Sequence, residues 1–246
     1  MQNDILIVSA TEKEVTGLLE NSFIHSREKT LSEKTFISAH LNDRPYDLII
    51  TGPSVINTAH ALTIALERNR PKIIIQTGYA GIFPESGLCP GDITVAEKEQ
   101  YIHAGVESTS GSVKLSHLPF PLVENMMSTA SGTYSIDENY VKKAYAILLK
   151  TSLANECTIS RGPVITVSTI TSTLKTRTAL FTTFSPLMEA MEGAASQHVA
   201  SLYNIPFIEV RSGSNYVGDR DRKKWDIPLA TKRLTSALCA IIDKIL

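Results

Sequence analysis

Two carboxylates and one amide are the side chains of this sequence that are best placed to act on a ligand. Glu14 and Glu192 each stand at the start of a predicted helix, where an acid can face a ligand. A carboxylate has two acceptor oxygens, so it suits a vicinal diol, and it favours positive charge that develops nearby. Asn215 can donate a hydrogen bond through its nitrogen and accept one through its oxygen.

Each of these residues also has an ordinary structural explanation. Glu14 and Glu192 fit first-turn acids that complement a helix dipole, and Asn215 fits a turn. Met191, which precedes Glu192, fits a core residue, and Glu12 is a rival to Glu14 in the same segment. The residue types alone therefore leave catalysis and structure open.

Apolar runs and helical spacing predict the elements that must position these side chains. The expected strands cover residues 4–8, 34–40, 46–51, 72–77, 91–96, 158–169 and 206–211. The expected helices begin after Thr11, where Thr11 and Glu14 have the spacing of a capping box, and cover 55–68, 137–150, 192–203 and 228–244. Residues 105–135 look rich in loops.

Strands that alternate with helices predict an α/β fold. We expect residues 1–246 to form a single domain, a three-layer α/β/α sandwich with a mixed, largely parallel central sheet. Ligands of such folds bind beyond the carboxyl ends of the strands. The polar clusters that follow the predicted strands, at 9–14, 51–57, 77–81, 167–171 and 212–221, are therefore the first places to look for a site.

The composition excludes several classes of function. A net charge of −1 gives no general attraction to nucleic acid or to an anionic membrane, and no apolar run approaches the ~20 residues that span a bilayer. The three cysteines are far apart, and the six histidines lack metal-ligand spacing. With no phosphate-binding or dinucleotide fingerprint, we expect no metal, no cofactor and a cytoplasmic protein whose partner is a small molecule.

Four segments in order resemble one known family. They are SATEKEV at 9–15, TGYAG at 77–81, MEGAA at 191–195 and VRSGSN at 210–215. Together they resemble the nucleoside phosphorylase superfamily, and more closely its nucleosidase branch, which includes methylthioadenosine/S-adenosylhomocysteine nucleosidases and futalosine hydrolases. The resemblance runs from about Ile5 to the C-terminal helix. It implies a nucleoside phosphorylase-like fold and a homodimer or larger homo-oligomer.

The resemblance also implies roles for individual residues. Glu14, immediately before Val15, matches the glutamate that activates the attacking water, and Glu192 matches the one that accepts hydrogen bonds from the ribose hydroxyls, with Met191 along the sugar. The purine is expected near residues 77–81 and 167–170. The binding residues there are Ala80, Gly81 and Ile170, the last at the position where the nucleosidases stack an aromatic residue.

Asn215 departs from the pattern of the methylthioadenosine nucleosidases, which carry an aspartic acid at this position to protonate N7 of adenine. An amide is no proton source at neutral pH, but it can hydrogen-bond a 6-oxopurine. Hydrolysis is favoured over phosphorolysis, because Gln76 stands where the hexameric phosphorylases have an arginine, and the Glu14 carboxylate would repel phosphate.

Futalosine is the substrate that the resemblance favours, with dehypoxanthine futalosine and hypoxanthine as products, in the route to menaquinone. Futalosine carries a benzoate at its 5′ extension, which Arg220 or Arg222 is expected to bind, although a solvated basic turn explains them equally well. Alternatives are another purine nucleosidase or phosphorylase, of inosine or methylthioadenosine type, and a non-catalytic nucleoside-binding protein on the same fold.

Overall fold

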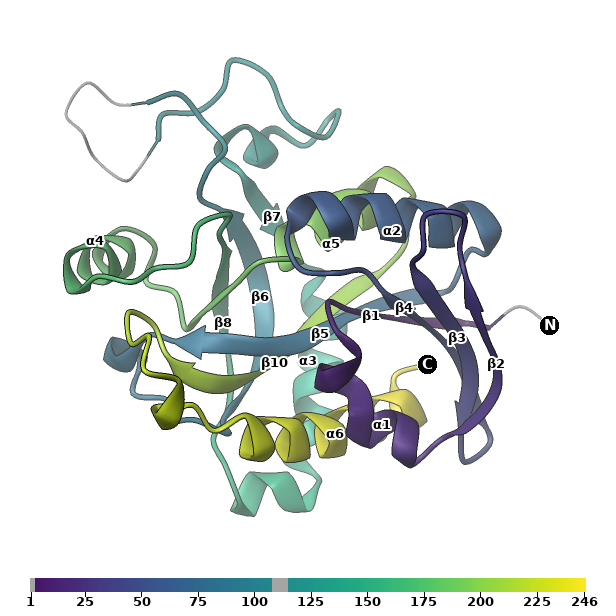
Figure 1. Ribbon diagram of the computed structural model, residues 1–246. Helices are drawn as coiled ribbons and strands as arrows, with labels where there is room; N and C mark the ends of the chain where they lie inside the picture. The colour runs from purple at the N-terminus through teal and green to yellow at the C-terminus, as the bar shows by residue number, and fades with distance from the viewer. Residues whose placement is uncertain (1–2, 108–114) are drawn as a thin grey trace.

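A mixed sheet with helices on both faces organises the chain, of which the computed structural model describes residues 3–107 and 115–246 (Figure 1). The strands are β1 (Ile5–Ser9), β2 (Phe23–Lys29), β3 (Thr35–Leu41), β4 (Arg44–Ile50), β5 (Ile73–Ile82), β6 (Ile93–Tyr101), β7 (Thr133–Ser135), β8 (Ile159–Thr166), β9 (Met188–Ala190) and β10 (Phe207–Tyr216). The α-helices are α1 (Thr16–Glu20), α2 (Val55–Arg68), α3 (Glu138–Leu149), α4 (Leu174–Phe184), α5 (Gly193–Leu202) and α6 (Ile227–Lys244). Short 3-10 turns are η1 (Glu12–Val15), η2 (Pro84–Ser86), η3 (Met127–Ser131), η4 (Ser152–Asn155) and η5 (Arg222–Lys224).

The sheet is open at one end and closed at the other. Its order is β10-β6-β8-β9-β5-β1-β4-β3-β2, with β7 beside β6. Strand β10 also pairs with β5, so β5, β10, β6, β8 and β9 form a closed ring. The strands β4, β1, β5 and β10 run parallel to one another at the centre, while β2 and β3 extend the open edge antiparallel.

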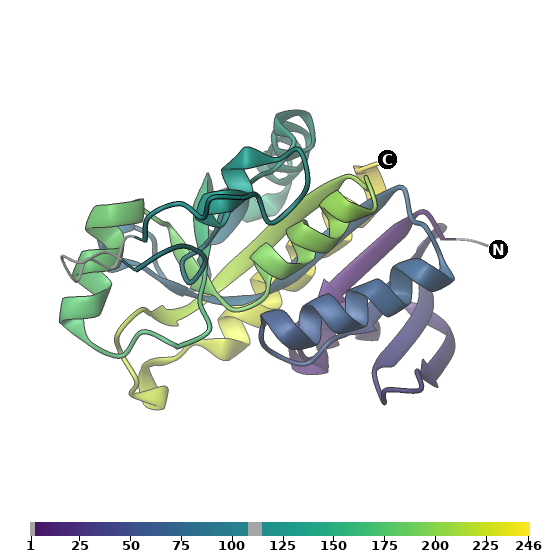
Figure 2. The same cartoon turned by 90° about the horizontal axis from the view of Figure 1, so that it is seen from above.

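The helices form the outer two layers. α2 and α5 lie side by side over one face of the sheet, as Figure 2 shows, and α1, α3 and α6 pack together on the other face. The expected α/β sandwich is thereby confirmed.

Burial explains why these segments fold as they do. All five residues of β1 are buried because the strand lies between β4 and β5 and is covered on both faces, which is why its sequence is a continuous apolar run. In α2, the buried side chains recur three and four residues apart, from Thr58 to Leu66, so one stripe of the helix faces the sheet. In α6, Asp226 caps the first turn by accepting a hydrogen bond from the Leu229 N–H.

Three strands extend further than the sequence predicts: β6, expected to end at residue 96, continues to Tyr101, and β5 and β10 are longer as well. The prediction ended one strand before Gly78 and another at Arg211, but β5 continues to Ile82 and β10 to Tyr216. The two strands pair in parallel along this extra length, with a bulge between Gly213 and Asn215, so the ladder satisfies backbone groups that a glycine-rich turn would have exposed. The segments 77–81 and 212–216 therefore lie on the sheet and not in loops after it.

Three strands and one α-helix are not predicted from the sequence, and among them β7 is a three-residue strand inside the segment expected to be rich in loops. β2 is exposed along its whole length, α4 buries one side chain, Leu180, and β9 has three residues. None of them shows the alternation or helical spacing that marks a half-buried element. The strand expected at 158–169 ends at Thr166, so the residues after it form a loop.

Candidate active site

A cavity of about 220 Å³ opens where β5, β9 and β10 meet the turn that follows β1. It brings together most of the residues singled out from the sequence, which come from six separate segments of the chain. Lining it are Glu14, Ala80, Gly81, Ile170, Met191, Glu192, Asn215 and Arg220. Arg222 is not among the residues that line it.

Glu14 reaches the cavity from a capping box at the start of η1. The Thr11 N–H and Thr11 hydroxyl donate to Glu14 Oε2 at 2.7 and 2.9 Å, and Ser9 Oγ lies 3.2 Å from the same oxygen. The other oxygen, Oε1, accepts a hydrogen bond of 3.0 Å from the Tyr79 N–H of β5. The carboxylate is thus held in one orientation by the chain on both sides of the cavity.

Burial makes Glu14 a stronger base than an ordinary surface carboxylate. Glu14 is only 7% exposed. This desolvation, together with the negative charge of Glu192, raises the pKa of Glu14. Arg211 and the two backbone N–H donors oppose the rise without cancelling it. A base whose pKa is closer to the working pH removes a proton more effectively.

Gly78 makes the close approach of Glu14 to β5 possible. A Cβ atom added at Gly78 would lie 2.6 Å from Glu14 Oε1 and 2.8 Å from Arg211 Nη1. The φ angle of Gly78, +148°, is also one that side-chain-bearing residues rarely adopt. This position therefore requires glycine for both reasons.

Glu192 lies at the junction of β9 and α5, where it is 5% exposed. Its Oε1 accepts a 3.2 Å hydrogen bond from the Ser54 N–H, and its Oε2 lies 3.2 Å from Arg211 Nη1. Each carboxylate oxygen has two lone pairs, so Oε1 keeps acceptor capacity in a residue that lines the cavity. Such an oxygen can receive a hydroxyl of a sugar.

A fully buried arginine, Arg211, to which the sequence alone assigns no role, forms an ion pair with Glu192. Arg211 donates to Glu209 Oε1 at 2.6 Å as well as to Glu192. Burial alone would lower the pKa of Arg211, but the two carboxylates outweigh burial, so the pKa of Arg211 is raised. Behind it, burial and the neighbouring Glu209 hold the pKa of Glu99 well above its usual range. Glu99 Oε2 accepts a hydrogen bond from Thr166.

Asn215 faces the cavity from β10 with its amide partly engaged. Its Oδ1 accepts a hydrogen bond of 2.8 Å from Ser214 Oγ, and its Nδ2 donates to the Tyr216 carbonyl at 3.1 Å. An amide nitrogen carries two N–H groups. One donor therefore remains for a ligand.

Glu189 is a second acid of the cavity, and the sequence reasoning did not single it out. It lies on β9, is 7% exposed, and accepts hydrogen bonds from the Thr171 N–H and the Thr171 hydroxyl. The recognisable motif begins two residues later, at Met191, so Glu189 lies outside it. Only the short strand β9, which the sequence did not predict, reveals that Glu189 also faces the site.

Arg220 and Arg222 follow β10 in an exposed turn around one aromatic ring. Their guanidinium carbons lie 5.2 and 5.9 Å from the ring centre of Trp225. Arg220 and Trp225 line the cavity, so a cation and an aromatic face stand at its mouth.

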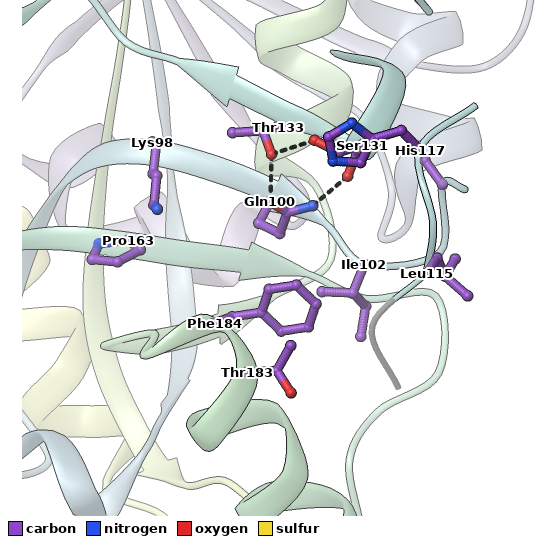
Figure 3. Close-up of a pocket in the computed structure, with 11 residues that line it drawn as sticks. Lys98, Gln100, Ile102, Leu115, His117, Ser131, Thr133, Pro163, Thr183 and Phe184 are labelled. Carbon is purple, nitrogen blue, oxygen red and sulfur yellow. Dashed lines mark hydrogen bonds between the residues drawn. The ribbon is translucent and has the colours of Figure 1, made fainter. Parts of the chain in front are cut away.

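A second cavity lies between β6 and α4, near the chain segment that carries Leu115 (Figure 3). Its central amide, Gln100, donates to the Ser131 carbonyl and accepts from the Thr133 hydroxyl, each at 2.6 Å. These polar groups bind one another, and none of the acids discussed above reaches this cavity. It therefore offers no comparable chemistry.

The structure describes residues 3–107 and 115–246. That part of the chain holds no group of three His, Cys, Asp or Glu side chains placed to bind a metal ion. Nor does it hold a helix long and apolar enough to cross a membrane.

Comparison with known proteins gives one family. A model of the phosphorylase superfamily matches residues 4–246. The chain is 32% identical to a futalosine hydrolase of Acidothermus cellulolyticus over 196 residues, which cover 79% of this chain and 74% of that protein. It is 27% identical to a 5′-methylthioadenosine/S-adenosylhomocysteine nucleosidase of Oceanobacillus iheyensis over 243 residues, which cover 97% and 98%.

A solved structure shares the fold over nearly the whole length. It is the S-adenosylhomocysteine nucleosidase from Streptococcus pyogenes in complex with 5-methylthiotubericidin, with a TM-score of 0.80 and 25% identity, covering 98% of this chain and 97% of that one. These relatives and this structural neighbour are nucleosidases, which are N-glycosyl hydrolases.

Proposed function

The chain belongs to the phosphorylase superfamily, and from that premise we propose that it hydrolyses the N-glycosidic bond of a purine nucleoside whose base is a 6-oxopurine. The observation that carries the proposal is the cavity that Glu14, Glu192 and Asn215 share. It combines a desolvated base, a second carboxylate and a neutral amide. These are the groups needed to activate water, hold a ribose and receive a leaving purine.

In this mechanism the ribose is held before the bond breaks. Glu192 accepts hydrogen bonds from the 2′- and 3′-hydroxyls, and Met191 lies along the sugar. As the glycosidic bond lengthens, positive charge grows on the ribosyl group, and the negative carboxylates of Glu14 and Glu192 stabilise it. Glu14 then takes a proton from the water that attacks C1′.

The nucleophile is water in this proposal and not phosphate. Glu14 and Glu192 place negative charge where an anionic nucleophile would need a cation. Gln76, at the position that the hexameric phosphorylases give to an arginine, is buried, accepts a hydrogen bond from Ser196 and donates to the Thr77 carbonyl. Arg211 is already bound to Glu192 and Glu209, so it does not supply that cation.

The leaving base is the point on which the two kinds of relative differ. The free N–H of Asn215 can stabilise the charge that moves onto the purine, but an amide gives up no proton at neutral pH. This fits hypoxanthine, which leaves well when N7 is hydrogen-bonded, better than adenine. The proposal therefore favours the activity named in the relative from A. cellulolyticus over that named in the relative from O. iheyensis.

Futalosine is the proposed substrate, and its benzoate-bearing end would lie at the mouth of the cavity. Arg220 stands there beside Trp225, which offers a cation for the carboxylate and an aromatic surface for the ring. Arg222 contacts the same ring from outside the cavity, so it supports the turn. Dehypoxanthine futalosine, the second product, would serve menaquinone synthesis, and we expect the enzyme to act as a homo-oligomer.

The test is base release from four nucleosides: futalosine, aminofutalosine, inosine and methylthioadenosine, each with and without phosphate. We expect rapid, phosphate-independent release of hypoxanthine from futalosine. Adenine release from aminofutalosine or methylthioadenosine would contradict the proposal that Asn215 favours a 6-oxopurine as the leaving base. A requirement for phosphate would show a phosphorylase, and binding without release from any nucleoside would show a non-catalytic binding protein.

A further inference from the structure

Glu189 is a buried acid of the cavity that the mechanism above does not use. Thr171 supplies both of its hydrogen-bond donors, the N–H at 3.0 Å to Oε1 and the hydroxyl at 2.5 Å to Oε2. Each carboxylate oxygen has a second lone pair. A carboxylate that is 7% exposed and lines a ligand cavity is costly to bury unless its remaining acceptor capacity is met. A donor on the ligand would meet it.

The sheet places Glu189 opposite Asn215 across a glycine. Gly81 of β5 is the register partner of Glu189 on β9 and also of Asn215 on β10. Register partners on neighbouring strands project their side chains to the same face of a sheet. Strands lie about 4.8 Å apart, so the two Cα atoms stand roughly 10 Å apart. Gly81 between them has no side chain, and Val217 Cγ2 would lie 3.0 Å from a Cβ atom added there. Gly81 and Val217 both line the cavity, so they offer an apolar surface against which a planar base can pack.

The two side chains offer opposite hydrogen-bonding groups to that base. Asn215 has one free N–H, and a Cβ atom added at Gly81 would lie 3.7 Å from Asn215 Nδ2, so the nitrogen lies beside the surface that Gly81 and Val217 form. Glu189 offers acceptors when it is ionised. Burial raises the pKa of Glu189 on balance, although the bonds from Thr171 and the charge of Arg220 oppose the rise. The N–H and hydroxyl that Thr171 donates favour the acceptor form of the carboxyl group.

A 6-oxopurine complements this arrangement, and a 6-aminopurine does not. Hypoxanthine carries a hydrogen on N1, which a carboxylate can accept, and acceptor atoms at O6 and N7, which an amide N–H can reach. Adenine has a bare lone pair on N1, which would face the carboxylate oxygens. A site built to hydrogen-bond one group strongly rejects the analogue that lacks it.

We propose that Glu189 is a specificity-determining residue that accepts the N1–H of a 6-oxopurine base, while Asn215 donates to the opposite side of the same base. The proposal deepens the function proposed above and rests on it for the placement of the base. It assigns the choice between the two purine classes to a pair of side chains on β9 and β10, and not to Asn215 alone.

Equilibrium binding of free bases tests this without turnover. Hypoxanthine, 1-methylhypoxanthine and adenine are titrated into the wild type, Glu189→Gln and the control Glu138→Gln, which changes an exposed acid on α3. We expect the wild type and the control to bind hypoxanthine more tightly than the other two bases. In Glu189→Gln, affinity for hypoxanthine should fall by roughly 10- to 150-fold, the equivalent of one charged hydrogen bond, and adenine should lose little or gain.

A second variant separates base recognition from support of the loop that contains Thr171. Thr171→Val removes the hydroxyl bond but keeps the carboxylate, so it should change the affinities for hypoxanthine and adenine by a similar factor. If Glu189→Gln also changed both bases equally, or if the wild type did not prefer hypoxanthine over 1-methylhypoxanthine, the proposal would be overturned. Failure of the proposed hydrolysis would appear separately, as absence of base release from nucleosides.

Discussion

Glu14 shows how the fold changes an ordinary residue. By sequence it is one of two acids in a first helical turn, and its neighbour Glu12 has the same chemistry. In the structure Glu12 is exposed and paired with Arg27, whereas Glu14 is buried, bound by four donors and directed into the cavity. The capping box makes the difference, because it turns the carboxylate of the third helical residue back toward the chain.

These two acids make a matched pair for the first prediction. Glu14→Gln should lower kcat by ~10²–10⁴-fold, because the general base is lost while the amide keeps the size of the side chain. Glu12→Gln should leave kcat within about twofold, since an exposed ion pair contributes little. Steady-state kinetics with circular dichroism as the folding control measures both. Near-wild-type turnover in Glu14→Gln would refute the catalytic assignment.

The pH dependence of the reaction follows from the electrostatics of Glu14. Its pKa is raised by burial first and by Glu192 second, and the base must be ionised to act. Activity, as kcat/KM, should therefore fall on the acid side at a pH above 4.5, the ordinary value for this carboxyl. Glu192→Gln should be less active, and its activity should fall at a lower pH than that of the wild type, because one cause of the raised Glu14 pKa is gone. An unchanged limb would mean that another group controls it.

Sequence reasoning found the residues that stand in recognisable segments and missed those defined by pairing. Glu14, Glu192 and Asn215 belong to three of the four ordered motifs, so they can be selected without a structure. Glu189 faces the cavity only because β9 pairs with β5 in a particular register. Arg211 was inside a motif, but its role comes from complete burial between acids, which one sequence does not display.

The strands β5 and β10 carry the site on regular structure. Their predicted ends fall short because glycine after a strand normally marks a turn, whereas here Gly78 keeps space for Glu14 within a continuing strand. The tertiary pairing of β5 with β10 overrides that local signal. The consequence is functional, since side chains on paired strands are held more precisely than side chains on loops.

Two glycines with positive φ test this point. Gly78→Ala would push a methyl group against Glu14 and Arg211, so we expect a loss of roughly 100-fold in kcat, as for a misplaced catalytic group, together with a lower Tm. Gly87→Ala adds a methyl group with no atom within 4 Å, so only the backbone strain of about 1–2 kcal/mol remains. Its kcat should be unchanged. Equal kinetic effects in both variants would show that Gly78 has no special role.

At the scale of the whole molecule, a chain of buried charges joins the strands of the closed ring to α5. Glu192, before α5, lines the cavity, and Glu99 on β6 and Glu209 and Arg211 on β10 lie behind it. All four are at most 5% exposed. A Cβ atom added at Gly193 would overlap Glu99 and Glu209 together, so the two carboxyl groups approach the same point of the helix start. Such an approach is stable when one of the two carries a proton.

The proton on Glu99 makes the stability of the fold depend on pH. In the folded chain, burial first and Glu209 second raise the pKa of Glu99 well above 4.5, its ordinary value, which also applies to the unfolded chain. At any pH between the unfolded and the folded pKa, the folded state therefore binds more protons than the unfolded state. The free energy of unfolding must then fall as pH rises from about 4.5 toward the folded pKa. Glutamine has the shape of the protonated acid and does not titrate. Glu99→Gln should therefore gain stability relative to the wild type as pH rises from 5 to 8.

Thermal unfolding of the two proteins at a series of pH values measures this gain. For a chain of this size, each kcal/mol corresponds to about 2–4 °C in Tm. Glu138→Gln is the control, because Lys142 lowers the pKa of the exposed Glu138. Glu138 is therefore fully ionised above pH 5 in both the folded and the unfolded state, and its contribution to the free energy of unfolding no longer changes with pH. The Tm difference between this variant and the wild type should stay flat above pH 5. A Tm difference for Glu99→Gln that did not grow with pH would mean that Glu99 is ionised in the folded protein. The cluster would then hold three acids against one arginine, and its stability would have to come from groups beyond these four.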